Sequence, residues 1–122
     1  MTAPVRQESR RLLSVSRDTP LLIGRNDMLA IAGYSVSSPR EPLDAILLLQ
    51  HDEYLAVLIG HSVLPDEAAA IAAKAKALHL PVIYVYRGNV PKPEWADLSV
   101  DNDRDIPILL RFLDRQNGEL AS

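Results

Sequence analysis

Two long apolar runs constrain the fold of this chain more than any other feature. They are LAVLI at residues 55–59 and VIYVY at residues 82–86, and neither alternates apolar with charged side chains. A strand with one face in water shows such alternation, whereas a strand of a parallel sheet is covered on both faces and reads as a continuous run. We therefore predict two buried parallel strands, over 54–60 and 81–88.

Shorter strand candidates alternate with helix candidates along the rest of the chain. The further strands are predicted at 10–16, 34–38 and 98–100. The helices are predicted at 19–33, 39–52, 64–80 and 105–118. Strands separated by helices of this length indicate βαβ units with right-handed crossovers. The predicted fold is therefore α/β, a flavodoxin-like doubly wound sheet of five parallel strands between two layers of helices.

The boundaries of several helices carry specific signals. Asp18 or Thr19 can cap the first helix, and Pro20 suits its first turn because the N–H that proline lacks would be unpaired there. Gly33 is a suitable left-handed residue with which to stop that helix. Asp105 can cap the last helix. These signals place the ends of the elements and, with them, the loops in which a site can form.

The second helix is expected to start at a similar signal. Ser38 followed by Pro39 resembles a cap followed by a first-turn proline. The apolar spacing then favours an inward stripe of Leu43, Ile46 and Leu47. With 122 residues, the chain is expected to form one domain over 10–117, preceded by a loose arm at 1–9 and followed by a short tail at 118–122.

The composition argues against several classes of function. Cysteine is absent, which excludes disulfides, thiolate metal sites and a cysteine nucleophile. The net charge is −3 and the basic residues are scattered, so no electrostatic footprint for nucleic acid is present. No apolar stretch has the length of a signal peptide or a membrane helix. We expect a cytoplasmic protein with neither a nucleic-acid nor a membrane partner.

Sites in open parallel sheets form beyond the carboxyl ends of the strands. The residues that follow the predicted strands are Ser16-Arg17-Asp18, Ser37-Ser38, Gly60-His61-Ser62, Tyr86-Arg87-Gly88 and Asp101-Asn102. The central strand thus delivers Gly60, which has no side chain, to the position where chemistry is most expected. His61 and Ser62 are adjacent on an extended stretch and lack an orienting acid, so they predict a polar loop rather than a catalytic pair.

The sequence resembles a response-regulator receiver domain over roughly residues 10 to 116. Three phrases carry the resemblance: MLAIAGYSV, EYLAVLIGHSVLPDE and ALHLPVIYVYRG. They are similar to the family's first helix and second strand, its third strand and following loop, and its fourth strand. The resemblance implies a site in which an aspartate after the third strand accepts a phosphoryl group. It also implies Mg²⁺ held by acidic residues, with a Ser/Thr and a Lys that read the phosphate.

Every position of that implied site departs from the family pattern. The phosphoacceptor position falls on Gly60, and the acidic pair falls on Ser16 and Arg17. The Ser/Thr position falls on Tyr86, and the lysine position lies near Asp101. Glycine offers no oxygen nucleophile, and a serine with an arginine is a poor ligand set for Mg²⁺. The pattern indicates a degenerate receiver, or pseudo-receiver, that has no catalytic residue, binds no metal or cofactor and is not an enzyme.

Two positive functions remain open. The first is a signalling or scaffold module that binds a protein partner or forms a homodimer without being phosphorylated. The second is a regulatory module that binds a small anion or a nucleotide at a rim formed by Arg17, His61 and Arg87. The simpler interpretation of the two arginines is that they pair with nearby acids such as Asp18 or Asp101.

The proline-rich segment 89–97 replaces the family's fourth helix, which we expect to be shortened or lost. Trp95 within it is either a plug packed on the domain or an exposed anchor for a partner, and the plug is favoured because a lone tryptophan is usually largely buried. Basic residues in and near the last helix extend the candidate interaction surface. With Trp95, that surface consists of Arg104, Arg111 and Arg115.

Overall fold

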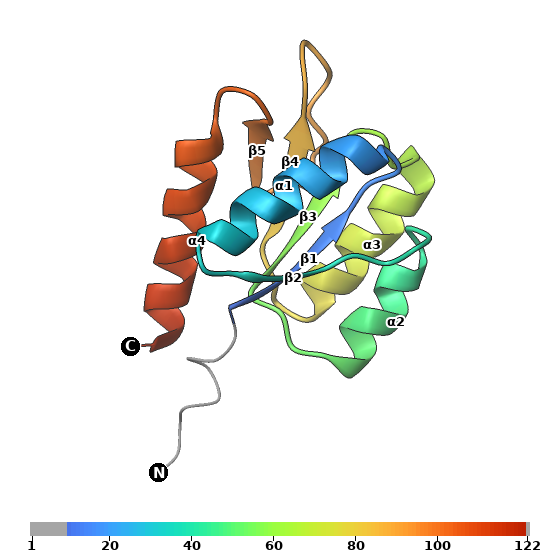
Figure 1. The fold of residues 1–122 in the computed structure, drawn as a ribbon. Coiled ribbons are helices and arrows are strands. Elements are labelled where there is room, and N and C mark those ends of the chain that lie inside the picture. Colours follow the sequence, from blue (N-terminus) through green and yellow to red (C-terminus); the bar gives the residue numbers. More distant parts are fainter. Residues whose placement is uncertain (1–9, 122) are drawn as a thin grey trace.

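The described part of the chain forms a single five-stranded sheet covered by helices on both faces (Figure 1). The structure is a computed structural model that describes residues 10–121, with side chains as far as residue 118. The predicted arm at 1–9 lies outside the described residues. No helix within the described part of the chain is both long enough and apolar enough to cross a membrane.

All neighbouring strands of the sheet are parallel, as the sequence predicts. The strands are β1 (Arg11–Val15), β2 (Ser35–Ser37), β3 (Ala56–Gly60), β4 (Val82–Tyr86) and β5 (Leu98–Asp101). Their order across the sheet is β2-β1-β3-β4-β5, which is the doubly wound arrangement. β3 is central, so Gly60 lies at the middle of the carboxyl edge.

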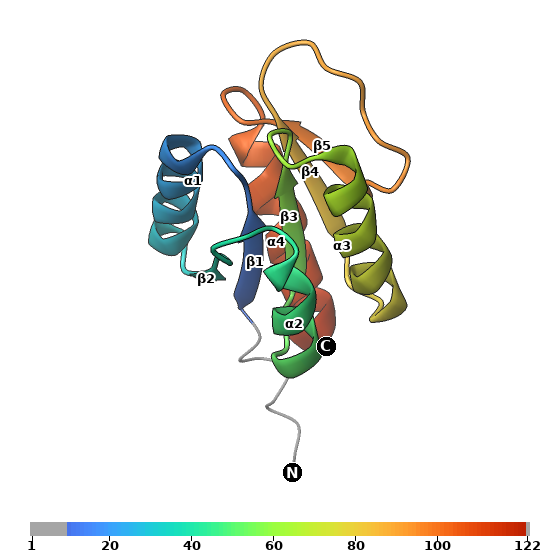
Figure 2. The same ribbon diagram turned by 90° about the vertical axis from the view of Figure 1, so that its right-hand side faces the viewer.

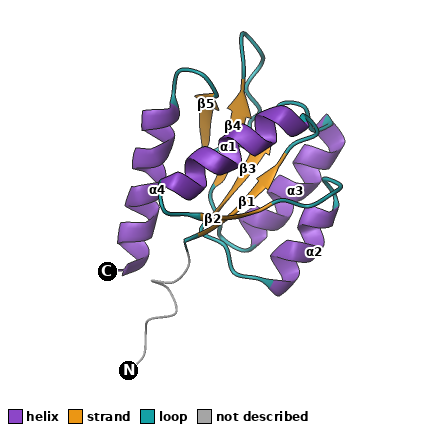
Figure 3. Ribbon diagram, viewed as in Figure 1, coloured by secondary structure: helices purple, strands orange, loops and turns teal. Residues whose placement is uncertain are grey.

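Within the described residues, four helices make up the two outer layers (Figure 3). They are α1 (Thr19–Ile31), α2 (Asp44–His51), α3 (Pro65–Ala77) and α4 (Ile106–Ala121). The buried residues of α2 and α3 share one core cluster, and those of α1 and α4 share the other. The predicted three-layer α/β fold is therefore confirmed.

β3 is buried on both faces, which explains its continuous apolar run. Val57 and Ile59 point into the α2/α3 cluster, and Ala56 and Leu58 point into the α1/α4 cluster. All four side chains are fully buried. Water is excluded from both faces of the central strand, so an apolar residue is favoured at every position along it.

The chain between β4 and β5 contains no helix in the described structure. Residues 87–97 form an irregular segment that arches beside α3 (Figure 2). The expected loss of the fourth receiver helix is therefore confirmed. Trp95 from this segment packs against the α2/α3 cluster.

The first helix begins and ends as predicted. Asp18 is its N-cap and accepts a hydrogen bond at 3.1 Å from the backbone N–H of Leu21. Gly33 follows the helix with φ +101°, the left-handed conformation that glycine adopts without strain.

The second helix differs from the prediction, because it begins at Asp44 and not after Pro39. Pro42 disfavours a helical conformation for the residue before it, which delays the helix by about one turn. The inward residues are Ala45 and Leu49, whereas Leu43 and Leu47 are 47% and 56% exposed. Of the predicted stripe, Ile46 packs against the core as expected, whereas Leu43 and Leu47 were wrong, because this leucine-rich segment supports more than one apolar face.

The end of the chain also differs from the expected boundary. α4 continues to Ala121, through most of the segment expected to be a tail. The Asp105 carboxylate, expected to cap α4, accepts a hydrogen bond at 2.8 Å from the backbone N–H of Asp101. Asp105 thereby joins the end of β5 to the start of the last helix.

Candidate functional site

The candidate site lies where β1 and β3 end side by side at the carboxyl edge of the sheet. Val15 pairs with Ile59 in the register of these two strands, so Ser16 and Gly60 follow them as neighbours. A Cβ added at Gly60 would lie 3.3 Å from Ser16 Oγ and 3.4 Å from the Val15 carbonyl oxygen. The Ser16 side chain therefore occupies the space into which any side chain at Gly60 would have to project.

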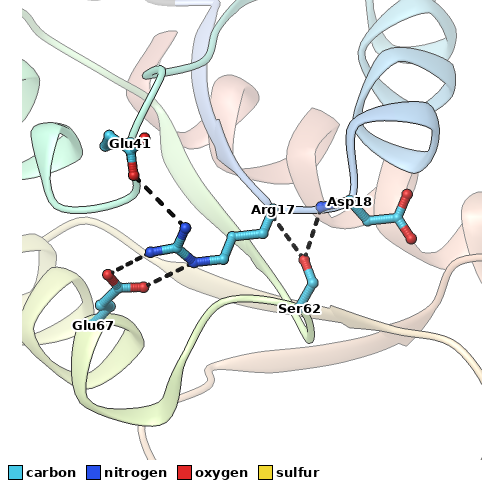
Figure 4. Close-up of polar contacts among 5 residues, drawn as sticks. All are labelled: Arg17, Asp18, Glu41, Ser62 and Glu67. Atoms are coloured by element: carbon cyan, nitrogen blue, oxygen red, sulfur yellow. Dashed lines mark hydrogen bonds and ion pairs between the residues drawn. The ribbon is translucent and has the colours of Figure 1, made fainter.

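Ser62 is the hub of the polar contacts at this edge (Figure 4). Its Oγ accepts hydrogen bonds from the backbone N–H groups of Arg17 at 2.8 Å and Asp18 at 3.2 Å. Ser62 Oγ also lies 3.0 Å from Ser16 Oγ. The two N–H groups occupy the acceptor sites of the Ser62 hydroxyl. The proton of that hydroxyl is therefore left to donate to Ser16 Oγ.

Ser16 completes this arrangement, which we call the serine latch (Ser16 and Ser62). Ser16 Oγ accepts from the backbone N–H of Asp18 at 3.0 Å and donates to the Asp18 carbonyl at 3.4 Å. The latch joins the loop after β1 to the loop after β3, across a sequence separation of 46 residues. The sequence predicted Ser62 to be a polar loop residue, and its role follows only once the two loops are known to meet.

Arg17 joins two further segments to the same edge, α3 and the loop before α2. Its guanidinium pairs with Glu67 on α3, with Nη2–Oε2 at 2.7 Å and Nε–Oε1 at 3.3 Å. Nη1 of Arg17 lies 3.7 Å from the Glu41 carboxylate, which belongs to the loop before α2 (Figure 4). A two-point guanidinium–carboxylate contact is the most favourable geometry for such a pair.

Arg87 pairs with Asp103, at 3.0 Å and 3.1 Å. His61 is exposed on the loop after β3. Both arginines are thus matched by carboxylates, although neither of the expected acids, Asp18 and Asp101, is the partner. This pairing does not favour a rim at which Arg17, His61 and Arg87 share one anion.

The remaining mapped positions also lack the groups that would read a phosphate. Tyr86 stacks on Tyr84 with ring centroids 6.0 Å apart, and the Lys92 ammonium lies 5.0 Å from the centre of the Tyr86 ring. Asp101 Oδ1 accepts a hydrogen bond at 2.8 Å from the backbone N–H of Asp103. An aromatic ring and a loop-stabilising carboxylate therefore stand at these two positions.

A buried arginine below the site was not anticipated from the sequence. Arg25 of α1 is 5% exposed and donates to Ser14 Oγ at 3.1 Å and 3.0 Å and to the Val15 carbonyl at 3.3 Å. Burial lowers the pKa of its guanidinium to about 10. Arg25 fixes α1 against the end of β1, and a polar Ser14 inside an apolar strand is the one sequence signal that points to it.

The predicted interaction residues divide into two groups. Trp95 is partly buried and makes an edge-to-face contact with Tyr84, with ring centroids 5.6 Å apart. The plug interpretation of Trp95 therefore agrees with its packing. The arginines of the set are exposed: Arg104, Arg111 and Arg115.

Comparison with known proteins identifies the fold. The N-terminal domain of a response regulator/sensory box/GGDEF protein from Carboxydothermus hydrogenoformans superposes with a TM-score of 0.73 at 15% identity, covering 88% of this chain and 93% of that one. A CheY-like receiver domain from Methanospirillum hungatei gives 0.70 at 17% identity, covering 89% and 97%. No protein-family model and no curated protein matches the chain in sequence.

A third similar structure supports the same fold. The receiver domain of a sensor histidine kinase from Pseudomonas aeruginosa superposes with a TM-score of 0.74 at 16% identity, covering 88% of this chain and 97% of that one. That protein coordinates a magnesium ion in its active-site cleft. The chain described here therefore has the receiver fold.

The residues at this edge do not fit a magnesium ion. Mg²⁺ requires near-octahedral oxygen ligands and is usually held by one or two carboxylates. The carboxylate of Asp18 caps α1, and the hydroxyls of Ser16 and Ser62 are bonded to backbone groups. Within residues 10–118, no group of three or more histidine, aspartate or glutamate side chains is placed to hold a metal.

Proposed function

We propose that the protein is a pseudo-receiver: a non-catalytic signalling or scaffold module that acts through protein binding and is not phosphorylated at the usual position. The observation that carries this proposal is the serine latch beside Gly60. In this latch, two hydroxyls that bond to each other occupy the place where a receiver needs a nucleophile and a cation. In this proposal the module is cytoplasmic and needs no cofactor.

The chemistry of the edge supports a phosphorylation-independent role. Phosphoryl transfer needs an oxygen nucleophile in line with the donor and a cation to neutralise developing charge. Gly60 supplies no nucleophile, and Arg17 is held by Glu67 and Glu41. The latch and this ion-pair network join three loops, which favours one conformation of the edge over a switch between two.

The exposed side of α4 is the surface we assign to a partner. Arg111 and Arg115 are exposed on it, and Arg104 precedes the helix. The nearby Asp114 carboxylate accepts a hydrogen bond from Tyr34, and none of the ion pairs among the described residues joins it to these arginines. A basic patch of this kind fits an acidic surface, on another protein or on a second copy of the chain.

Treatment with acetyl phosphate and Mg²⁺ tests the absence of phosphorylation. We expect the intact mass to stay unchanged, whereas an active receiver treated in parallel gains one phosphoryl group. A phosphoryl adduct that maps to any aspartate would refute the proposal.

Charge reversal tests the surface. Arg111→Glu with Arg115→Glu should weaken capture of the partner, or dissociate a homodimer in sedimentation, whereas the exposed Arg40→Glu should leave both unchanged. If Arg40→Glu weakens partner capture or dimerisation as much as the double variant does, α4 is not the binding surface.

A further inference from the structure

A cavity of about 300 Å³ lies beside the candidate site, under the segment that replaces the missing helix. Its lining residues come from the loop before α3, the start of α3, the strand β4 and residues 87–97. The segment 87–97 arches beside α3 in Figure 2. Its walls are mainly apolar and aromatic, and they include Val63, Tyr84, Pro91, Pro93 and Trp95. This volume is at the lower end of the range for small-molecule sites, which suits a ligand with one or two rings.

The walls of the cavity are held in place by their own packing. Trp95 contacts Tyr84 edge to face at 5.6 Å, and Tyr84 stacks on Tyr86 at 6.0 Å. Trp95 and Val63 also belong to the packing of the α2/α3 core. Proline side chains add rigid surfaces that lose little conformational entropy on binding. The cavity is therefore largely preformed, which lowers the entropic cost of filling it.

The charge of the cavity is one-sided. Lys92 and His61 line it, and none of the described residues that line it is acidic. Among the ion pairs of the described chain, none involves Lys92, whose ammonium rests over the Tyr86 ring at 5.0 Å. By contrast, Asp52 and Glu53 line a cavity at the opposite edge of the sheet, and Asp97 lines another.

We propose that this cavity binds a small organic carboxylate with an aromatic body. The ring fills the space between Trp95, Tyr84 and the prolines, and the carboxylate faces the ammonium of Lys92 at the rim. The site shares His61 with the proposed anion rim but uses neither Arg17 nor Arg87, since it is built on an apolar cavity. It does not depend on the proposed function, because ligand binding here and partner binding at α4 use different surfaces.

Three matched probes test the proposal on the whole chain: hydrocinnamate, its neutral amide hydrocinnamamide, and phenylpropylamine. Trp95 is the single tryptophan, so its fluorescence, excited where these probes do not absorb, reports on the cavity directly. We expect a saturable change with hydrocinnamate and a dissociation constant on the order of 1 mM. The amide should bind several times more weakly, and the amine more weakly still.

Variants of Lys92 separate recognition from nonspecific adsorption. Lys92→Met should weaken hydrocinnamate binding by about fivefold, the contribution of one exposed ion pair, and abolish the preference for the acid over the amide. Lys92→Arg should restore that preference, and Lys74→Met should leave it unchanged. No saturable change with hydrocinnamate, equal binding of all three probes, or unaltered binding to Lys92→Met would overturn the proposal.

Discussion

Replacing Ser62 with alanine removes the group that ties the loop after β1 to the loop after β3. The change deletes the acceptor of the Arg17 N–H at 2.8 Å and the contact with Ser16 Oγ at 3.0 Å. The Asp18 N–H loses one acceptor at 3.2 Å but keeps Ser16 Oγ at 3.0 Å. Two hydrogen bonds are therefore lost in full, and a third is retained through a second acceptor.

The expected cost of this variant follows from those two bonds. A hydrogen bond contributes about 1 kcal/mol net, and water can partly replace Ser62 at the exposed Arg17 N–H. The free energy of unfolding should fall by about 1.5 kcal/mol, equivalent to a decrease of about 5 °C in Tm. Urea unfolding followed by circular dichroism measures this directly, and the m-value should stay unchanged because the fold is retained.

A matched serine and a double variant complete the test. Ser38→Ala removes an exposed hydrogen bond from Asn26 at 2.9 Å and should cost less than about 0.5 kcal/mol. Ser16→Ala combined with Ser62→Ala should show a coupling energy of about 1 kcal/mol. If Ser62→Ala is as stable as the Ser38→Ala control, the serine latch does not join the two loops and the reasoning is refuted.

Three further predictions concern the same edge and its surroundings. Gly60→Asp should lower the free energy of unfolding by about 1–3 kcal/mol, because its Cβ would lie 3.3 Å from Ser16 Oγ. Mg²⁺ should not raise the Tm of this variant, and a Mg²⁺-dependent rise would contradict the proposed loss of the metal site. Arg17→Gln should cost less than about 1 kcal/mol, an effect that fades in high salt; a larger cost independent of salt would show that the pairs are not solvent-screened. Burial and the neighbouring Asp114 raise the pKa of Tyr34, so its contribution to stability is present below pH ~10 and is lost as pH rises further. In urea unfolding, the free energy of unfolding of Tyr34→Phe should therefore fall less above pH ~10 than that of the parent chain. The same dependence of this free energy on pH in both proteins would contradict the assignment.

The elements that the sequence could predict are those set by local chemistry. The unbroken apolar run before Gly60 predicted a strand buried on both faces, and every residue of β3 is buried. Asp18 and Gly33 mark the ends of α1, because capping and a left-handed stop depend on a few neighbouring residues. The start of α2 was harder to predict from the sequence. Pro42 disfavours a helical conformation for the residue before it, whereas the apolar pattern that favours a helix extends across this position.

The contacts of the site could not be predicted, because they join segments distant in the sequence. Ser62 becomes a hub only when the loop after β3 meets Ser16 and Arg17, more than 40 residues earlier in the chain. The same is true of Glu67, the partner of Arg17, which lies 50 residues away. Local patterns do not determine which of several nearby acids an arginine reaches, so the expected partners differed from those in the structure.

The most direct test of the central proposal is a titration of the amide resonances of the protein with Mg²⁺ and beryllofluoride, a phosphoryl mimic. We predict that the resonances of Ser16, Gly60 and Ser62 stay unchanged, while those of an active receiver shift and saturate under the same conditions. Saturable shifts confined to these three residues would contradict the proposal, because they would show that the edge still holds a cation and a phosphoryl group.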